Sequence, residues 1–178
     1  MFKNSFVRLK EVRVITMLAM MSALYVVLYM AKIPLAMESR VSLTFLPVVA
    51  AGYLSGPVGA CVVGIIGDIV GSLLFPQGAY FPGFTLSAAI NGLILGGFFY
   101  KAKSNITLKS FVANFIAILF VNVFLNTVWV SILYEKAFAV YFYSRVIKNI
   151  LVYPVQAFLS IFIIKLLDNS GISKKYKN

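Results

Sequence analysis

Residues 58–91 of the chain read VGACVVGIIGDIVGSLLFPQGAYFPGFTLSAAIN. The stretch contains an apolar segment at about 58–74, a break at 75–83 that is rich in proline, glycine and aromatic residues, and the start of a second apolar segment at about 84–100. Both segments approach the roughly 20 apolar residues with which an α-helix crosses the ~30 Å hydrocarbon layer of a membrane. The pattern therefore predicts two membrane-spanning helices joined by a rigid, aromatic, non-helical loop.

The composition of the whole chain extends this prediction to all of its 178 residues. Hydrophobic residues make up 61% of the chain and charged residues 12%, so the apolar surface is too large for a soluble domain of this size to bury. We expect one all-α integral membrane domain over residues 1–178. Its six predicted transmembrane helices lie at about 13–31, 41–54, 58–74, 84–100, 109–134 and 146–167. The second is short and contains Pro47, so we expect it to be kinked or to cross only part of the membrane.

Basic residues are concentrated at one side of these predicted helices. The chain carries 16 Lys and Arg against five Asp and Glu, a net charge of +11. Most of the basic residues fall in the N-terminal segment, the 101–109 loop and the C-terminal tail, which six spans place on the same side. Because basic loops stay in the cytoplasm, we expect cytoplasmic termini and a pocket open to the outer face of a bacterial plasma membrane. We interpret the excess charge as a contact with anionic lipid and not with nucleic acid.

The residue types that most enzyme and metal sites need are missing from the sequence. There is no histidine and a single cysteine, Cys61, within an apolar run. No Ser-His-Asp set, no closely spaced pair of carboxylates and no HExxH motif occurs, and the phosphate-binding pattern G-x-x-x-x-G-K-[ST] is absent as well. We therefore expect no catalytic residue, no metal and no cofactor. If the chain moves a solute uphill, the energy comes from a gradient or from a partner.

Asp68 is the only acidic residue inside a predicted span. A carboxylate within the membrane is costly, so it must face protein, water or a ligand and not lipid. It either hydrogen-bonds a nearby serine or asparagine or accepts paired N–H donors from a ligand. Gly64, Gly67 and Gly71 around it allow a helix or a ligand to approach closely, and close helix packing is the commoner reason for such spacing.

Five basic residues lie on the predicted outer side, offset only by Glu38 and Glu135. Lys32 and Lys136 suit ordinary anchoring at the membrane interface. Arg40, Arg145 and Lys148 stand at the ends of spans, where they could instead converge on an anion. Arginine suits a carboxylate because its planar fork pairs with both oxygens.

Amide and aromatic side chains supply further polar and stacking groups. Asn91 lies in the fourth predicted span, and four more asparagines lie in the last two: Asn114, Asn122, Asn126 and Asn149. Trp129 and Tyr134 suit either an interfacial aromatic belt or a surface on which a ligand stacks. The asparagines exceed what membrane anchoring requires, which favours a ligand pocket or, as an alternative, a polar pore along the fifth span.

Ala19 and Ala23 form a small-x-x-x-small pattern in the first predicted span. Such spacing lets two helices approach closely, and it is frequent in packed membrane helices. It fits an internal contact and a docking surface for another membrane protein equally well.

The most specific parts of the sequence are RVSLTFLPVVAAGYLSGPVGACVVGIIGDIVGSLLFP at 40–76 and GAYFPGFTLSAAINGLILG at 78–96. With the six-span layout and the basic tail, they resemble the substrate-binding S components of the energy-coupling factor (ECF) vitamin transporters, specifically the folate group. The second stretch is similar to the YFPGFTLSA signature of that group. Ala19 and Ala23 resemble the A-x-x-x-A pattern with which such proteins dock on the shared coupling subunit.

The resemblance implies the high-affinity folate-binding subunit of an ECF-type ABC importer. Such a subunit would capture extracellular folate, associate with a transmembrane coupling protein and two ATP-hydrolysing subunits, and reorient in the membrane to release the vitamin inside. The implied partners are folate or a related pterin-glutamate, these three subunits and the lipid bilayer. The missing phosphate-binding loop agrees with ATP hydrolysis by partners.

For a folate, the resemblance implies a pocket with two chemically different ends. The flat pterin would stack on aromatic residues from 75–84 and 135–143, with Asp68 or an asparagine binding its N–H edge, and the glutamate end would lie near a cation. Pro82 and Gly83 would hold the aromatic loop in one shape and reduce the entropy lost on binding. The substrate-binding candidates are Arg40, Asp68, Tyr80, Phe81, Pro82, Gly83, Phe84, Thr85, Asn91, Trp129, Arg145 and Lys148, and the docking candidates are Ala19 and Ala23.

Two alternatives stay open at this point. S components share a fold across different ligands, so the vitamin could be another one, such as thiamine or pantothenate. The chain could also be an unrelated small membrane protein. An enzyme would need a reactive cluster, and the chain offers a single acid within a span. A channel would need a polar stripe along several spans, and the asparagines of the fifth span, Asn114, Asn122 and Asn126, keep this alternative open.

Overall fold

The computed structural model describes residues 5, 10–31, 33–36, 39–76, 78, 80–100, 102, 105–134 and 138–172, with the side chains at 33–36, 39–41, 134, 138–141 and 144 outside this description. In chain order the elements are α2 (Val12–Met30), β1 (Ile33–Ala36), β2 (Ser39–Val41), α3 (Phe45–Ser55), α4 (Pro57–Leu74), α5 (Pro82–Phe99), α6 (Ile106–Ala117), the π-helix η1 (Ile118–Leu125), α7 (Asn126–Tyr134) and α8 (Phe138–Asn169).

Apolar helices dominate the described part of the chain. Five runs are long and apolar enough to cross a membrane: Val12–Met30, Pro57–Leu74, Pro82–Phe99, Ile106–Leu133 and Arg145–Asn169. A sixth apolar helix, α3, has 11 residues. The predicted helical membrane class is confirmed, with one addition that the sequence did not predict, since β1 and β2 pair as a small antiparallel hairpin.

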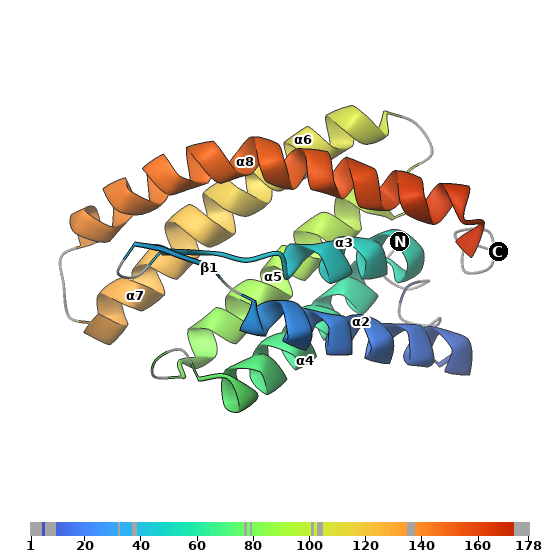
Figure 1. The fold of residues 1–178 in the computed structure, drawn as a ribbon, viewed down its shortest axis with the longest axis horizontal. Coiled ribbons are helices and arrows are strands. Elements are labelled where there is room, and N and C mark those ends of the chain that lie inside the picture. The colour runs from blue at the N-terminus through green and yellow to red at the C-terminus, as the bar shows by residue number, and fades with distance from the viewer. Residues whose placement is uncertain are drawn as a thin grey trace.

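The helix ends gather at two opposite sides of the molecule (Figure 1). α2 begins and α8 ends at one side, in agreement with termini on the same side of the membrane. The hairpin, the end of α4 with the start of α5, and the end of α7 with the start of α8 lie at the other side. The charge distribution makes this second side the outer one.

Two predicted loops are shorter in the structure than in the prediction. α5 starts at Pro82, so Pro82 and Gly83 belong to its first turn and not to the predicted non-helical loop at 75–83. Proline suits the first helical position because its φ is already helical, and because an N–H group at this position would have no acceptor within the helix. The predicted loop over 135–144 is wrong beyond its first residues, because α8 starts at Phe138.

Two helical segments also differ from the prediction. The second starts later than residue 41, because Ser39–Val41 pairs with β1 and α3 begins only at Phe45. The fifth, Ile106–Tyr134, is not a uniform α-helix, because Ile118–Leu125 has the wider turns of a π-helix. Such turns are rare and often occur at functional sites.

The short helix α3 forms the centre of the bundle. All of its residues except Leu46 are buried, and it packs against α2, α4, α5 and α8. At 1.5 Å per residue its length is about 16 Å, roughly half of the hydrocarbon layer. The longer helices extend past the start of α3 toward the outer side (Figure 1).

Candidate ligand-binding site

A cavity of about 350 Å³ lies at the outer end of α3. Ser42, Thr44, Phe45 and Val48 line it where α3 begins, and the other lining residues come from α2, α4, α5, α6, η1, α7, α8 and the segment just before α5. Small-molecule sites in proteins span roughly 300–1,000 Å³. The space that the short helix leaves is thus large enough for an organic ligand.

Asp68 on α4 supplies the acidic group of this cavity. It is 8% exposed. Its Oδ2 accepts a 2.8 Å hydrogen bond from Thr85 Oγ1 on α5, and the Tyr80 hydroxyl lies 3.0 Å from the same threonine oxygen. A hydrogen-bonded carboxylate is tolerated in the membrane. Asp68 therefore has a side-chain partner within the protein, but this partner is a threonine and not the expected serine or asparagine. Asp68 also stands on the wall of the cavity.

Two tyrosines of α2 form the wall beside Asp68. The rings of Tyr25 and Tyr29 are stacked with centroids 6.5 Å apart, and both residues line the cavity. A Cβ at Gly67 would lie 2.4 Å from the Tyr25 ring, and one at Gly71 would lie 2.7 Å from the Tyr29 ring. The glycines of α4 thus serve close helix packing, and that packing places aromatic rings in the cavity wall.

Phe81 and Phe84 form a second aromatic wall at the start of α5. The Phe81 ring lies 5.7 Å from the Trp129 ring of α7, and Trp129 Nε1 donates a 3.0 Å hydrogen bond to Ser87 Oγ. A Cβ at Gly83 would lie 2.5 Å from Phe81 and 2.6 Å from Trp129. Gly83 and Trp129 therefore position Phe81 without lining the cavity themselves.

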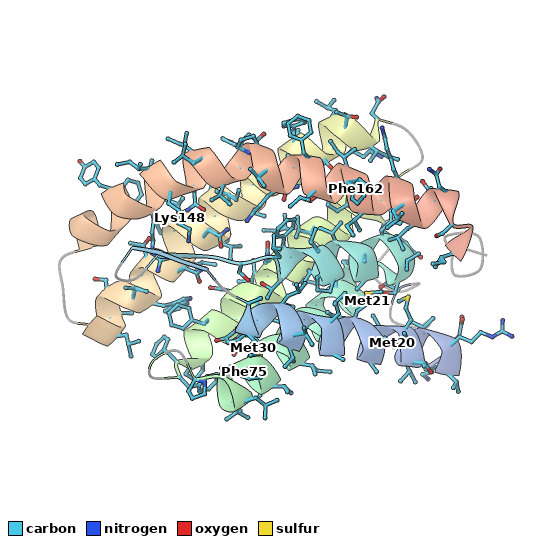
Figure 2. The ribbon with its side chains drawn as sticks, in the orientation of Figure 1. Met20, Met21, Met30, Phe75, Lys148 and Phe162 are labelled. Carbon is cyan, nitrogen blue, oxygen red and sulfur yellow. The ribbon has the colours of Figure 1, made fainter. Side chains whose placement is uncertain are left out.

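Arg145 and Lys148 bring positive charge to the wall that α8 forms. Figure 2 shows Lys148 on the side of α8 that faces the other helices. Arg145 Nη1 donates a long hydrogen bond of 3.4 Å to the backbone oxygen of Asn122. The cavity thus has a carboxylate on α4 and two cations on α8.

Amide side chains line the cavity between and below these charges. They are Asn91, Asn114, Asn122, Asn126, Asn149 and Gln156. Asn114 Nδ2 donates hydrogen bonds of 2.9 Å to the Ser110 backbone oxygen and 3.1 Å to Ser160 Oγ, which joins α6 to α8. The asparagines of the fifth span, which the sequence allowed to line a pore, therefore belong to the wall of this cavity.

The structure brings most of the sequence-predicted residues to one place. Those that line the cavity are Asp68, Tyr80, Phe81, Phe84, Asn91, Arg145 and Lys148. Pro82, Gly83, Thr85 and Trp129 lie directly beside them on α5 and α7. The backbone of Arg40 belongs to β2, whereas its side chain lies outside the described residues.

Some lining residues were not predicted, and one predicted group does not contribute. Tyr25 and Tyr29 carry a signal in their four-residue spacing, which puts them on one face of a helix. Ser42 and Thr44 had no such signal, because the predicted second span began at residue 41 and included both, whereas α3 begins only at Phe45. We expected aromatic residues of 135–143 to line the pocket. This prediction was wrong for the two whose side chains the structure describes, since Phe142 and Tyr143 do not line the cavity.

An apolar groove of about 510 Å³ lies between α2 and α4. Its lining residues are Ile15, Leu18, Ala19, Ser22, Ala23, Val26, Val62, Ile66 and Val70. Met20, which is 67% exposed, lies on the same helix outside the groove, and Met21 packs against the core (Figure 2). The docking candidates Ala19 and Ala23 thus share one surface hollow that their small side chains help to form.

Comparisons with known proteins give consistent results. The family model described as ECF transporter, substrate-specific component, matches residues 13–164. A folate transporter FolT from Clostridium novyi (strain NT) is 38% identical over 136 residues, 76% of this chain and 78% of that protein. A second FolT, from Leuconostoc mesenteroides subsp. mesenteroides, is 30% identical over 172 residues, 94% of this chain and 91% of that protein. The crystal structure of a FolT bound with folic acid matches with a TM-score of 0.78 at 29% identity and covers 86% of this chain and 92% of that chain.

Proposed function

The chain belongs to the substrate-specific components of ECF transporters, and we propose that it captures folate from outside the cell for import. It is a multi-pass protein of the cell membrane and a transport subunit. The observation that carries the proposal is the cavity with a carboxylate on α4, two cations on α8 and aromatic rings beside them.

Folate matches these groups along its length. Its pterin ring is flat and carries neighbouring N–H donors on one edge, and a p-aminobenzoyl linker joins the ring to a glutamate with two carboxylates. Asp68 would accept from the ring edge, because a carboxylate pairs well with two parallel N–H donors. Phe81, Phe84 and the two α2 tyrosines would contact the ring faces, which adds about 0.5–1.5 kcal/mol for each stacked pair beyond the area buried.

The cations of α8 would bind the glutamate end. Arg145 can pair with both oxygens of a carboxylate, while Lys148 acts as a point charge. Such charge-assisted hydrogen bonds are roughly twice as strong as neutral ones. A ligand without an anionic end, such as thiamine, would gain no charge-assisted hydrogen bond from these cations.

Calorimetry on the purified protein tests the ligand directly. We expect folic acid and 5-formyl-folate to bind tightly and thiamine and pantothenate to give no heat of binding. The Lys148→Met variant should bind folic acid more weakly, and Lys165→Met should bind it as the wild type does, because Lys165 is exposed near the other end of the same helix. Binding of thiamine or pantothenate in place of folates would assign the chain to another vitamin.

We further propose that a transmembrane coupling protein docks in the groove between α2 and α4 and that two ATP-binding subunits supply the energy. Family membership supports these partners, and the groove supports the place, because Ala19 and Ala23 would let a partner helix approach closely. Reorientation of the chain on these partners would then open the cavity to the cytoplasm.

Tryptophan substitution in the groove separates docking from binding. Ala19→Trp combined with Ala23→Trp should abolish folate uptake by cells that contain the partner subunits, while the purified variant still binds folic acid. Met20→Trp is the matched control, because this side chain lies on α2 outside the groove. If the double variant loses binding as well as uptake, the two alanines serve internal packing.

A further inference from the structure

One polar atom in the cavity wall has no hydrogen-bond partner within the described part of the chain. Asn126 lines the cavity, and its Oδ1 is buried without a donor. Its Nδ2 donates to Asn122 Oδ1 at 3.4 Å, which uses the amide nitrogen and leaves the oxygen. A buried acceptor without a partner costs free energy, so such an atom in a cavity wall calls for an explanation, and a donor on a bound ligand is one.

The π-helix explains how Asn126 reaches this wall. Asn122 and Asn126 follow Asn114 by eight and twelve positions along the chain. In a uniform α-helix they would point about 80° and 120° away from Asn114. The wider turns of η1, Ile118–Leu125, reduce the rotation per residue. All three asparagines consequently line the same cavity, because a rare backbone geometry has brought the Asn126 side chain to the wall that the other two share.

Asn126 stands between the two charged walls of the cavity. It is the first residue of α7 and follows directly on η1, and both elements pack against α5 on one side and α8 on the other. Asp68 lies on the side of α4 and α5, where Thr85 donates a hydrogen bond to it. Arg145 approaches from α8 and donates to Asn122 in the turn before Asn126.

We propose that Asn126 Oδ1 accepts a hydrogen bond from an N–H group in the linker between the flat ring and the carboxylate end of the ligand. The proposal rests on folate as the ligand, with its ring at Asp68 and its glutamate at the α8 cations. In folate the linker carries two such groups, the anilino N–H and the amide N–H. Asn126 then recognises the linker of the ligand, whereas Asp68 and the α8 cations recognise its two ends.

If Asn126 contacts the ligand, its replacement should weaken ligand binding without lowering the stability of the protein. Replacement of a purely structural asparagine would lower the stability. Leucine has nearly the shape of asparagine but no polar atom. In the unliganded protein, Asn126→Leu removes an unpartnered buried acceptor together with one long hydrogen bond to the partly exposed Asn122. These two effects oppose each other, so the melting temperature should change little. In the complex it leaves the ligand N–H without an acceptor, and the Kd for folic acid should rise roughly 5- to 150-fold. An asparagine that holds helices together would instead lower the melting temperature when replaced.

The test combines two protein variants with three ligands. Wild type, Asn126→Leu and Phe124→Leu are titrated with folic acid, with folic acid methylated at the anilino nitrogen, and with folic acid methylated at the amide nitrogen. Phe124→Leu is the matched control, since Phe124 lies in η1 and is half-exposed toward lipid. Unliganded melting temperatures are measured alongside.

We expect one of the two methylated ligands to bind wild type and Phe124→Leu more weakly than folic acid does, by about the same factor by which Asn126→Leu weakens folic acid binding. The same methylated ligand should bind Asn126→Leu as strongly as folic acid binds that variant. The methylation that behaves in this way identifies the donor. The proposal is overturned if Asn126→Leu binds folic acid as wild type does, if its loss of binding comes with a lower melting temperature, or if both methylations act equally on all three proteins. Absence of folic acid binding to wild type would instead count against the proposed function itself.

Discussion

Replacement of Asp68 by asparagine is the sharpest perturbation of the cavity. The carboxylate is nearly buried on α4 and accepts from Thr85 at 2.8 Å. In the proposed complex it also receives the N–H edge of the pterin. Asn keeps one oxygen acceptor but adds an NH₂ group, so one ligand donor loses its acceptor and the other hydrogen bond loses its charge assistance.

The expected loss follows from the strength of those hydrogen bonds. A hydrogen bond to a charged group contributes about 1.5–3 kcal/mol and a neutral one about 1 kcal/mol. Losing one charged bond and neutralising the other costs about 2–5 kcal/mol, which raises the Kd for folic acid roughly 30- to 5,000-fold. The stability of the unliganded protein should not fall, because Thr85 can still donate to the remaining oxygen and the costly intramembrane charge is gone.

Calorimetry in detergent gives the Kd, and a thermal melt of the unliganded protein gives the stability. Asp168→Asn is the control, because Asp168 lies at the opposite end of the molecule, where it accepts a 2.5 Å hydrogen bond from the Tyr53 hydroxyl. A Kd for Asp68→Asn within threefold of wild type would refute the assignment of the ring edge to Asp68. A parallel loss of binding and stability would show that the carboxylate acts through the fold.

Two further substitutions test the packing around the cavity. Gly83→Ala should weaken folate binding about tenfold or more with little loss of stability, because the new Cβ would lie 2.5 Å from Phe81 and 2.6 Å from Trp129 and must displace the aromatic wall; calorimetry checks this, and unchanged affinity would show that the wall tolerates displacement. Gly92→Ala should lower the free energy of unfolding by about 1–3 kcal/mol, because its Cβ would lie 2.5 Å from the Ala60 backbone oxygen on α4; a thermal melt checks this, and a wild-type melting temperature would contradict the close contact of α4 and α5.

The sequence predicts those parts of the fold that depend on composition. Apolar runs bounded by charge or by proline and glycine identify membrane helices without knowledge of their packing. Asp68 was identifiable for the same reason, since a carboxylate inside a span needs a polar environment whatever the fold. The aromatic segment around Phe81 was recognisable as a local motif, although Pro82 starts a helix where the sequence predicted a loop.

The parts that the sequence did not predict depend on contacts between distant segments. Tyr25 and Tyr29 enter the wall only because α4 offers glycines opposite them, and pairing of α2 with α4 is a tertiary fact. The π-helical turns of η1 do not follow from residue preferences in that apolar run. The sequence therefore named Asn126 as a candidate polar group but could not predict the linker contact that we propose for it. The hairpin lies in a short connection without alternating polarity and was missed for that reason.

The length of α3 has a consequence for the stoichiometry and tightness of transport. About 16 Å of packed apolar helix lies beneath the cavity, and the cavity of about 350 Å³ is of a size for one vitamin molecule. Taken alone, the chain thus has a binding cavity above a packed helix and not a continuous channel. A membrane that contains only this subunit should therefore hold its ion gradients while binding folate, and each turnover of the assembled importer should move one molecule.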